Sequence, residues 1–255
     1  MTSEIPRLHL ETVTPFMLAS LQTLMKQPAL SSFQLAGGTS IALLTGHRQS
    51  IDLDLFTVQP FTQEDIAPLI APFQPLTVKP TRIGVAYLLP APAGESALKV
   101  DLCNWRTRFL YPPVLIDGLR LTDLRDSCAD KLNAITDRDE LKDVWDIAEL
   151  LKEFSLPQMV DYYKRKHPFL DAKEPVRALT HFDYNKPVGF RVLNGETPAS
   201  IRERVETALL GFGQKPVQEK PLIIPEAYRN KLAQKGIEAK EPPAPLKPKR
   251  KGPKL

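Results

Sequence analysis

The chain has 255 residues, with 34 Lys and Arg against 30 Asp and Glu, 42% hydrophobic residues and two cysteines. No apolar run approaches the roughly 20 residues that a membrane span needs, and two cysteines do not make a disulfide framework. No basic patch precedes an apolar stretch at the N-terminus, so we predict no secretory signal, no membrane partner and a cytoplasmic protein.

The first half of the chain predicts a mixture of helices and strands. Thr14 suits an N-cap and Pro15 suits the first helical position, which predicts a helix over residues 14–27. The elements expected next, in chain order, are a strand over 33–36, a helix over 39–44, a strand over 51–56, a helix over 63–71, strands over 82–89 and 97–103, and a hairpin over 114–121 that turns at Asp117-Gly118.

From residue 122 onward the pattern predicts helices alone. They are expected over 123–136, 139–152, 156–166, 174–182, 199–210 and 226–235. This change predicts an α/β (α+β) protein with two lobes, one with a small mixed sheet over residues 1–121 and a helical one over 122–240.

The end of the chain has a different composition. Residues 241–255 are rich in Pro and Lys and nearly free of apolar side chains, which predicts a disordered tail. Residues 240–255 hold six basic residues and one acid, a charge of +5, so the rest of the +4 chain sums to −1. The tail is either a solubilising extension or a source of non-specific contacts with nucleic acid.

Two acids lie on the strand that begins at Ile51. Because a strand alternates its faces, Asp52 and Asp54 point to one side, and Ile51, Leu53 and Leu55 point to the other, into a core. Two carboxylates on one face repel each other, and a divalent cation between them would remove that cost. Hard oxygen ligands of this kind suit Mg²⁺ or Mn²⁺.

A third acid, Asp101, is flanked by apolar residues on the strand predicted over 97–103. If that strand lies beside the strand of Asp52 and Asp54, the three carboxylates converge. Three acids can hold two metal ions, the arrangement that stabilises the attacking and leaving oxygens in phosphoryl or nucleotidyl transfer. A surface position for Asp101 is the alternative.

A phosphate-binding element precedes the acids. Gly37-Gly38 follows a predicted strand and opens a helix that begins with Thr39-Ser40. Glycines allow a phosphate close to the backbone, and the free N–H groups of a helix N-terminus favour an anion. A nucleoside triphosphate with its metal ion would satisfy the phosphate site and the carboxylate site together.

These motifs resemble a known family. A Gly-Gly-Thr helix start, Asp-x-Asp and a later Asp on a strand are similar to the core of DNA-polymerase-β-type nucleotidyltransferases. Residues 35–56, with the run GHRQSIDLDLF, and residues 122–151, with Lys131-x-x-Ala134 and Lys142-Asp143-x-x-Asp146, narrow the resemblance to the AbiEii/AbiGii toxin nucleotidyltransferases. The resemblance covers roughly residues 33–151.

The resemblance implies roles for individual residues. Asp52, Asp54 and Asp101 would hold metal, and Asp101 would also help to activate the attacking hydroxyl. Lys131 would neutralise a triphosphate oxygen, and Asp146 belongs with these residues to the catalytic motifs. The implied nucleotide-binding residues are Gly37, Gly38, Thr39, Ser40, Arg48, Ser50, Lys131 and Asp143.

Helical geometry leaves alternatives for three of these residues. Lys131 falls on the apolar side of its helix, so either its stem packs while the ammonium reaches water, or this face lines a cleft and the ammonium meets phosphate. Asp143 and Asp146 share a helix face opposite an apolar stripe. They form either a solvated face with local partners Lys142 and Arg138, or the active-site acids that the resemblance implies.

The sequence therefore predicts a metal-dependent nucleotidyltransferase that moves a nucleoside monophosphate from an NTP to a hydroxyl and releases pyrophosphate. The resemblance implies an RNA acceptor, the tRNA 3′ end, and a toxin of a toxin–antitoxin or phage-defence system, with a possible antitoxin partner. The alternatives are transfer of the nucleotide onto protein, or a non-catalytic nucleotide-binding interaction protein.

Overall fold

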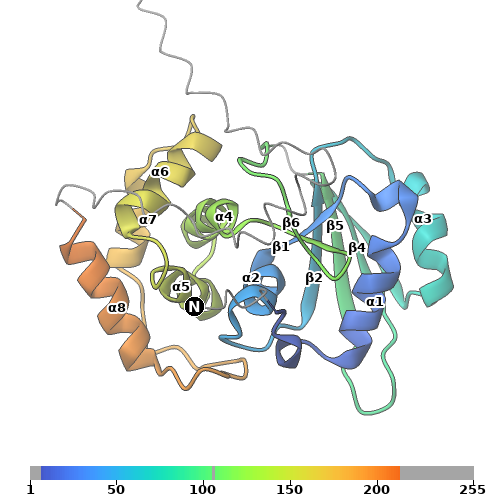
Figure 1. Ribbon diagram of the computed structural model, residues 1–255, viewed down its shortest axis with the longest axis horizontal. Helices are drawn as coiled ribbons and strands as arrows, with labels where there is room; N and C mark the ends of the chain where they lie inside the picture. Colours follow the sequence, from blue (N-terminus) through green and yellow to red (C-terminus); the bar gives the residue numbers. More distant parts are fainter. Residues whose placement is uncertain (1–6, 105–106, 213–255) are drawn as a thin grey trace, which may run out of the picture. The chain divides into compact units, whose positions relative to one another are not determined.

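Strands and helices are mixed up to Leu121, and helices follow (Figure 1). The structure is a computed structural model that describes residues 7–104 and 107–212. The strands of these residues are β1 Gln34–Ala36, β2 Asp52–Thr57, β3 Thr77–Thr81, β4 Gly84–Leu89, β5 Leu98–Asn104, β6 Val114–Ile116 and β7 Leu119–Leu121. Their helices are α1 Pro15–Met25, α2 Gly37–Thr45, α3 Gln63–Ile70, α4 Leu124–Asp137, α5 Leu141–Leu150, α6 Leu156–Lys166, α7 Lys173–Thr180 and α8 Pro198–Leu210, with short 3₁₀ turns at Leu10–Thr12, Pro28–Leu30 and Ala71–Phe73.

The strands form one mixed sheet in the order β3-β4-β5-β2-β1-β7-β6. β2 runs parallel to β5, and β1 runs parallel to β7, whereas the other neighbours are antiparallel. β2 and β5 therefore lie side by side in the middle of the sheet, where one face can carry a site and the other a core.

Local sequence signals explain several element boundaries. The Thr14 side chain accepts the first-turn N–H of Met17, and Pro15 begins α1, as predicted. Asp117 and Gly118 both have positive φ, 50° and 80°, which a two-residue hairpin of the expected type requires. These signals act within a few residues, so these element boundaries can be predicted without tertiary information.

The main core lies on one face of the sheet. Leu53 and Leu55 from β2 and Val85 from β4 are buried there, and α1 and α3 cover them (Figure 1). Helix α2 lies between the sheet and helices α4 and α5, while α4 also packs against α6 and α7. The start of α2 is therefore the place where the strands meet the helical half.

The structure corrects two expectations. Ile51 does not point into the core: it is 73% exposed, because β2 begins at Asp52 and Ile51 lies outside the ladder. Strand β3, for which the sequence pattern predicts no element, pairs with β4 as an exposed edge. All of its side chains are exposed and it contains Pro80, so it lacks the alternation that marks a half-buried strand.

Other expectations stay predictions. The helix over 226–235 and the tail over 241–255 lie outside the described residues. The described residues all belong to one compact unit, and the division into lobes at residues 121 and 122 is not tested by it. Among the helices of this part of the chain, none has the length and apolarity to cross a membrane.

Candidate active site

The three predicted acids lie on neighbouring strands. β2 carries Asp52 and Asp54, and the parallel register with β5 sets Asp101 opposite Asp54. Leu53 and Leu55 alternate with the acids and are buried in the core, so the acids occupy the opposite face of the sheet. The structure thus brings the three acids to one face, here called the carboxylate face.

The charges on the carboxylate face are crowded. Burial raises the pKa of Asp54 to about 6, and repulsion from Asp101 and Asp52 adds to that rise. The cations Lys131 and Lys99 oppose it only in part. A further positive charge would therefore stabilise the ionised form of Asp54.

Asp101 has two different carboxylate oxygens. Its Oδ2 accepts from the ammonium of Lys99 at 2.6 Å. Its Oδ1 is buried and has no hydrogen-bond partner among the described residues. A buried carboxylate oxygen without a partner is costly, so Oδ1 is free to accept a proton or a hydrogen bond.

The donor chemistry of the carboxylate face fits a divalent cation. Carboxylate oxygens are the ligands that Mg²⁺ and Mn²⁺ take, and both the partnerless oxygen of Asp101 and the raised pKa of Asp54 point to a missing positive charge. Within residues 7–104 and 107–212, no three His, Cys, Asp or Glu side chains form a ready-made metal cluster. The acids would have to turn together to share an ion.

Two consecutive glycines separate the carboxylate face from a second charged region. Gly37 has φ of 65°, and a Cβ on it would lie 2.2 Å from Asp54 Oδ2. A Cβ on Gly38 would lie 2.2 Å from Arg48 Nη2 and 3.2 Å from Asp146 Oδ2. Side chains are thereby excluded at both positions, and the backbone at the start of α2 comes close to an acid and a guanidinium at once.

The hydroxyls at the start of α2 point into the protein. Thr39 Oγ1 contacts Ser50 Oγ at 2.7 Å and donates to the carbonyl of Asp52. Ser40 donates to the carbonyl of Thr122 at 3.4 Å. Thr39, Ser40 and Ser50 are buried, so they tie α2 to the strands, and the backbone N–H groups of α2 are better placed than the hydroxyls to meet a phosphate.

Asp146 on α5 is the centre of a buried ionic network. It accepts from Arg48 Nε at 2.7 Å and Nη2 at 2.8 Å, from His47 Nε2 at 2.7 Å, and pairs with Lys131 Nζ at 2.6 Å. Burial alone would raise the pKa of Asp146, but Arg48, Lys131 and His47 outweigh it and hold the pKa well below its usual range. Asp146 is therefore ionised and joins the 47–48 segment to α4 and α5.

Asp143 lies one turn earlier on the same helix. Lys131 Nζ donates to its Oδ1 at 2.7 Å, and Arg138 Nε donates to its Oδ2 at 2.7 Å. Burial opposes ionisation, but these two cations lower the pKa of Asp143. Burial likewise opposes the charge of Lys131, whereas Asp146 and Asp143 raise its pKa.

The structure excludes one of the alternatives for each of the helical residues. Asp143 and Asp146 are fully buried, so the solvated-face interpretation is wrong, although the expected Arg138–Asp143 pair is present. Lys131 is buried between the two acids, so its ammonium does not reach water. Its contact with a phosphate stays a prediction.

The network carries an excess of positive charge. We call its five charged members the Asp146 cluster, and they are Arg48, Lys131, Arg138, Asp143 and Asp146. Three cations meet two acids, so these five side chains sum to +1, and they lie near both the N-terminus of α2 and the acids Asp52 and Asp54. The positive sum and the helix N-terminus favour an anion with several negative charges.

Sequence reasoning missed some members of this region. Phe190 stacks on Arg48, with the guanidinium carbon 5.3 Å from the ring centre. Val192 forms a bridge with Arg48, and the backbone of the 191–193 segment bonds to His47 and Gln49. No local signal marks a segment more than 140 residues away in sequence, whereas His47 could have been suspected from its position beside Arg48.

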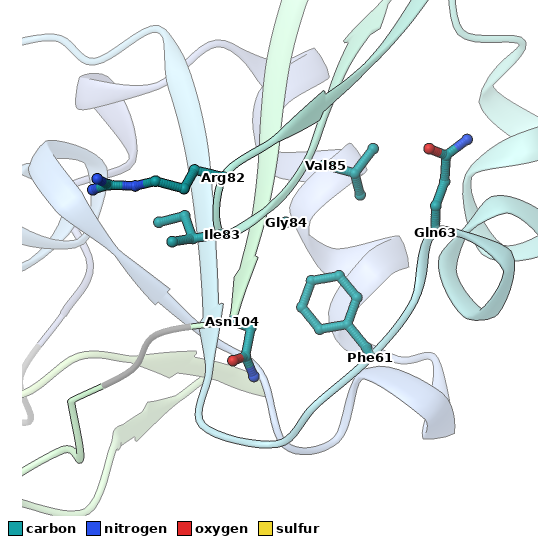
Figure 2. Close-up of a pocket in the computed structure, with 7 residues that line it drawn as sticks. All are labelled: Phe61, Gln63, Arg82, Ile83, Gly84, Val85 and Asn104. Atoms are coloured by element: carbon teal, nitrogen blue, oxygen red, sulfur yellow. The ribbon is translucent and has the colours of Figure 1, made fainter.

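A pocket of about 280 Å³ lies elsewhere, at the end of the sheet (Figure 2). Its lining residues are Phe61, Gln63, Arg82, Ile83, Gly84, Val85 and Asn104. Figure 2 shows Phe61, Gln63 and Val85 on one side, with the Arg82 side chain extending away from them. The sequence-predicted site residues do not line it, so this pocket is separate from the carboxylate face.

Comparisons with known proteins identify the class of fold. MenT4, a nucleotidyltransferase toxin from Mycobacterium tuberculosis, matches with a TM-score of 0.53 and 15% sequence identity, over 85% of this chain and 91% of that one. JHP933 from Helicobacter pylori matches with a TM-score of 0.44 and 14% identity, over 86% of this chain and 94% of that one. No curated protein matches the chain. The fold is similar to that of MenT4.

The family follows from the sequence itself. Residues 20–186 match the family described as nucleotidyl transferase AbiEii toxin, type IV TA system. This match covers more than half of the chain, which therefore belongs to the AbiEii family and is a nucleotidyltransferase. The family and the fold class expected from the motifs are confirmed, and the matched range contains the residues of both charged regions.

Proposed function

We propose that this nucleotidyltransferase moves a nucleoside monophosphate from an NTP to a hydroxyl at the 3′ end of tRNA, with Mg²⁺ or Mn²⁺, and acts as a toxin in the cytoplasm. The observation that carries the proposal is the pair of glycines at the start of α2. Gly37 abuts Asp54 and Gly38 abuts Arg48, so one short backbone segment joins acids suited to metal with cations suited to phosphate.

The triphosphate fits between these two regions. The N–H groups at the start of α2 would bind its oxygens, and the excess positive charge of the Asp146 cluster would offset its negative charge. Arg138 is the half-exposed cation of that cluster, since its side chain is 48% exposed. It can therefore reach a ligand without losing Asp143.

Asp52, Asp54 and Asp101 would hold the metal ions. Bound there, the ions supply a Lewis acid for the α-phosphate and lower the pKa of the acceptor hydroxyl. Asp101 Oδ1, buried without a partner among the described residues, would take the proton of that hydroxyl. The hydroxyl oxygen forms a bond to the α-phosphorus, the bond to the β-phosphate breaks, and pyrophosphate leaves.

The attraction of an acceptor to the protein would depend on the charge of the chain. The chain outside residues 240–255 sums to −1, so it supplies no net positive charge to attract RNA. An RNA acceptor would therefore be attracted at long range by the +5 tail. A protein acceptor would not need this charge. Nucleotide-sized mass shifts on protein, without label on RNA, would favour a protein acceptor.

The test uses the full-length protein with Mg²⁺ or Mn²⁺, each α-labelled NTP in turn, and total tRNA. We expect one NTP to label tRNA and Asp54→Asn to lower the rate by roughly 100-fold or more. Asp161→Asn is the matched control, an equal change at an exposed acid on α6, and should keep the wild-type rate. Label transfer unaffected by Asp54→Asn would refute the assigned site.

A toxin role has its own test. Expression of the wild-type chain should slow growth of a bacterial host, whereas Asp54→Ala should not. Co-expression of the neighbouring gene product should restore growth if that product is the antitoxin. Equal growth with both variants would contradict the toxin role and leave the transfer activity standing.

A further inference from the structure

Lys99 forms an ion pair with an acid of the carboxylate face, and neither the family motifs nor the proposed reaction uses it. It stands two residues before Asp101 on β5, so the two side chains share one face of the strand. Its Nζ lies 2.6 Å from Asp101 Oδ2. The parallel register also sets Lys99 opposite Asp52, which places it between two of the three acids.

The environment of Lys99 lets its ammonium move. Its side chain is 51% exposed, whereas that of Asp101 is 19% exposed. A second lysine near Asp54, Lys131, is buried and held by two carboxylates of the Asp146 cluster. Of these two lysines, only Lys99 can leave the carboxylate face by a change of rotamer into solvent.

We propose that Lys99 is an internal counter-cation of the carboxylate face, which a divalent metal ion has to displace from Oδ2 of Asp101 in order to bind there, while Oδ1 stays free for the proton of the acceptor hydroxyl. This inference rests on the proposed function, because it takes Asp52, Asp54 and Asp101 as the metal ligands. Lys99 is a positioning residue in this role: it contacts neither the nucleotide nor the acceptor, and it acts through Asp101.

The physical argument is one of competition. A carboxylate oxygen that accepts a short hydrogen bond from an ammonium is not free to ligate a metal ion, and two cations side by side repel each other. Lys99 therefore lowers the affinity of the site for a free metal ion. A metal ion that arrives with an NTP brings compensating negative charge, so Lys99 opposes it less.

The consequence is a preference for the metal–nucleotide complex over the free metal ion. Without Lys99, the site would fill with metal before the nucleotide arrives. With Lys99, metal binding and nucleotide binding are coupled, since the negative charge of the triphosphate offsets the repulsion between the metal ion and the displaced ammonium.

The experiment measures binding of Mn²⁺ to the full-length protein without nucleotide, by the loss of the free-ion electron paramagnetic resonance signal. Lys99→Met should bind Mn²⁺ roughly threefold more tightly than wild type, since it removes a half-exposed ion pair. Lys99→Arg should bind as wild type does. Lys79→Met is the matched control: Lys79 is an exposed lysine of the same sheet, and its register partner on β4 is Ala86 rather than an acid.

Two further variants connect the effect to Asp101. In an Asp101→Asn background, Lys99→Met should no longer change Mn²⁺ affinity, because the carboxylate for which Lys99 and the metal ion compete is absent. With a saturating non-hydrolysable NTP, the effect of Lys99→Met should shrink. Thermal melting of each variant checks that it is folded.

Unchanged or weaker Mn²⁺ binding by Lys99→Met, or an equal gain with Lys79→Met, would overturn the role of Lys99. In that case the proposed function still stands if Asp54→Asn abolishes both Mn²⁺ binding and transfer to tRNA. If neither wild type nor Lys99→Met shows Mn²⁺ binding that depends on Asp54, the metal site of the proposed function is wrong and Lys99 has no such role.

Discussion

Two buried ionic clusters each contain residues of the helical half of the chain, and the signs of their net charges are opposite. The Asp146 cluster has three cations and two acids. The second, here called the Lys166 cluster, has one cation and two acids, with Lys166 Nζ 2.8 Å from Asp126 and 2.9 Å from Asp130. Its excess negative charge is met by backbone N–H groups, since Leu110 and Tyr111 both donate to the Asp126 carboxylate.

The two clusters also differ in what surrounds them. The Asp146 cluster borders the start of α2 and, through Gly37, the carboxylate face. The Lys166 cluster fastens the loop after β5 onto α4 and α6, and Lys166 donates to both of its acids. Burial of charge is common to both, so burial alone does not mark a functional site. The excess of positive charge beside open helix N–H groups distinguishes the Asp146 cluster.

Truncation of the central acid in each cluster should separate these roles most strongly. Asp146→Ala and Asp126→Ala each leave buried partners unpaired and should cost roughly 3 to 5 kcal/mol of unfolding free energy. Asp146→Ala should also lower the transfer rate per folded molecule roughly 100-fold, because Arg48 and Lys131 lose their common anchor. Asp126→Ala should keep the rate of its folded fraction. Urea titration measures the unfolding free energy, and initial rates measure transfer. Equal losses of rate in the two variants would contradict the functional difference between the clusters.

Neutralising the buried lysine of each cluster should give a smaller difference between the clusters, seen in the affinity for NTP. Lys131→Met should weaken NTP binding roughly tenfold, since a charge-assisted contact to phosphate is worth about 1.5 kcal/mol or more. Lys166→Met should leave NTP affinity unchanged, although it lowers stability. Equilibrium binding of a labelled NTP analogue measures this difference. Identical affinities for the two variants would mean that Lys131 serves the fold alone.

Stability should depend on pH with opposite signs in the two clusters. Neighbouring cations hold the pKa of Asp146 well below the unfolded value, so its stabilising contribution is present above about pH 4 and is lost as pH falls below it. Burial raises the pKa of Asp126 despite its pairing with Lys166, so its contribution declines as pH rises above about 4.

The variants Asp146→Ala and Asp126→Ala again provide the measurement, now as urea midpoints between pH 3 and pH 6. The gap between wild type and Asp146→Ala should narrow toward low pH. The gap between wild type and Asp126→Ala should narrow toward higher pH. Parallel curves for both variants would show that the two carboxylates have similar environments.

Removal of the basic tail should have the smallest effect of these changes. It tests whether the two ionic clusters attract the RNA acceptor without the tail. Deletion of residues 241–255 should weaken tRNA binding and flatten its salt dependence, because fewer counterions are released. NTP binding should stay the same. Filter binding at several salt concentrations measures the slope, and an unchanged slope would return the tail to a solubilising role.

Much of the fold could be predicted because its signals are local. The cap at Thr14, the hairpin at Asp117-Gly118 and the alternation around Asp52 and Asp54 each involve neighbours in sequence. Strand β3 escaped prediction because an exposed edge has no buried face to create a pattern. Ile51 was misplaced because an alternating pattern does not mark the residue at which a ladder begins.

The residue types of the site could be predicted from the sequence, but the side chains that surround them could not. Asp52, Asp54 and Asp101 were predicted as one group, and the register of β2 with β5 brings them to one face. Helical geometry made Asp143 and Asp146 look solvated, because the partners that bury them include Arg48 and His47, about 100 residues away. Lys99 and Phe190 carried no motif at all.

The amino-acid sequence by itself determined the family, the helices and strands with clear periodicity, and the acids suited to metal. These depend on residue type and on short spacings. Only the tertiary structure decided that Gly37 abuts Asp54 while Gly38 abuts Arg48, that two acids of α5 are buried among cations, and that Lys99 holds Asp101. Such facts depend on contacts between distant segments, and the energy of a charge is set by those contacts rather than by its neighbours in sequence.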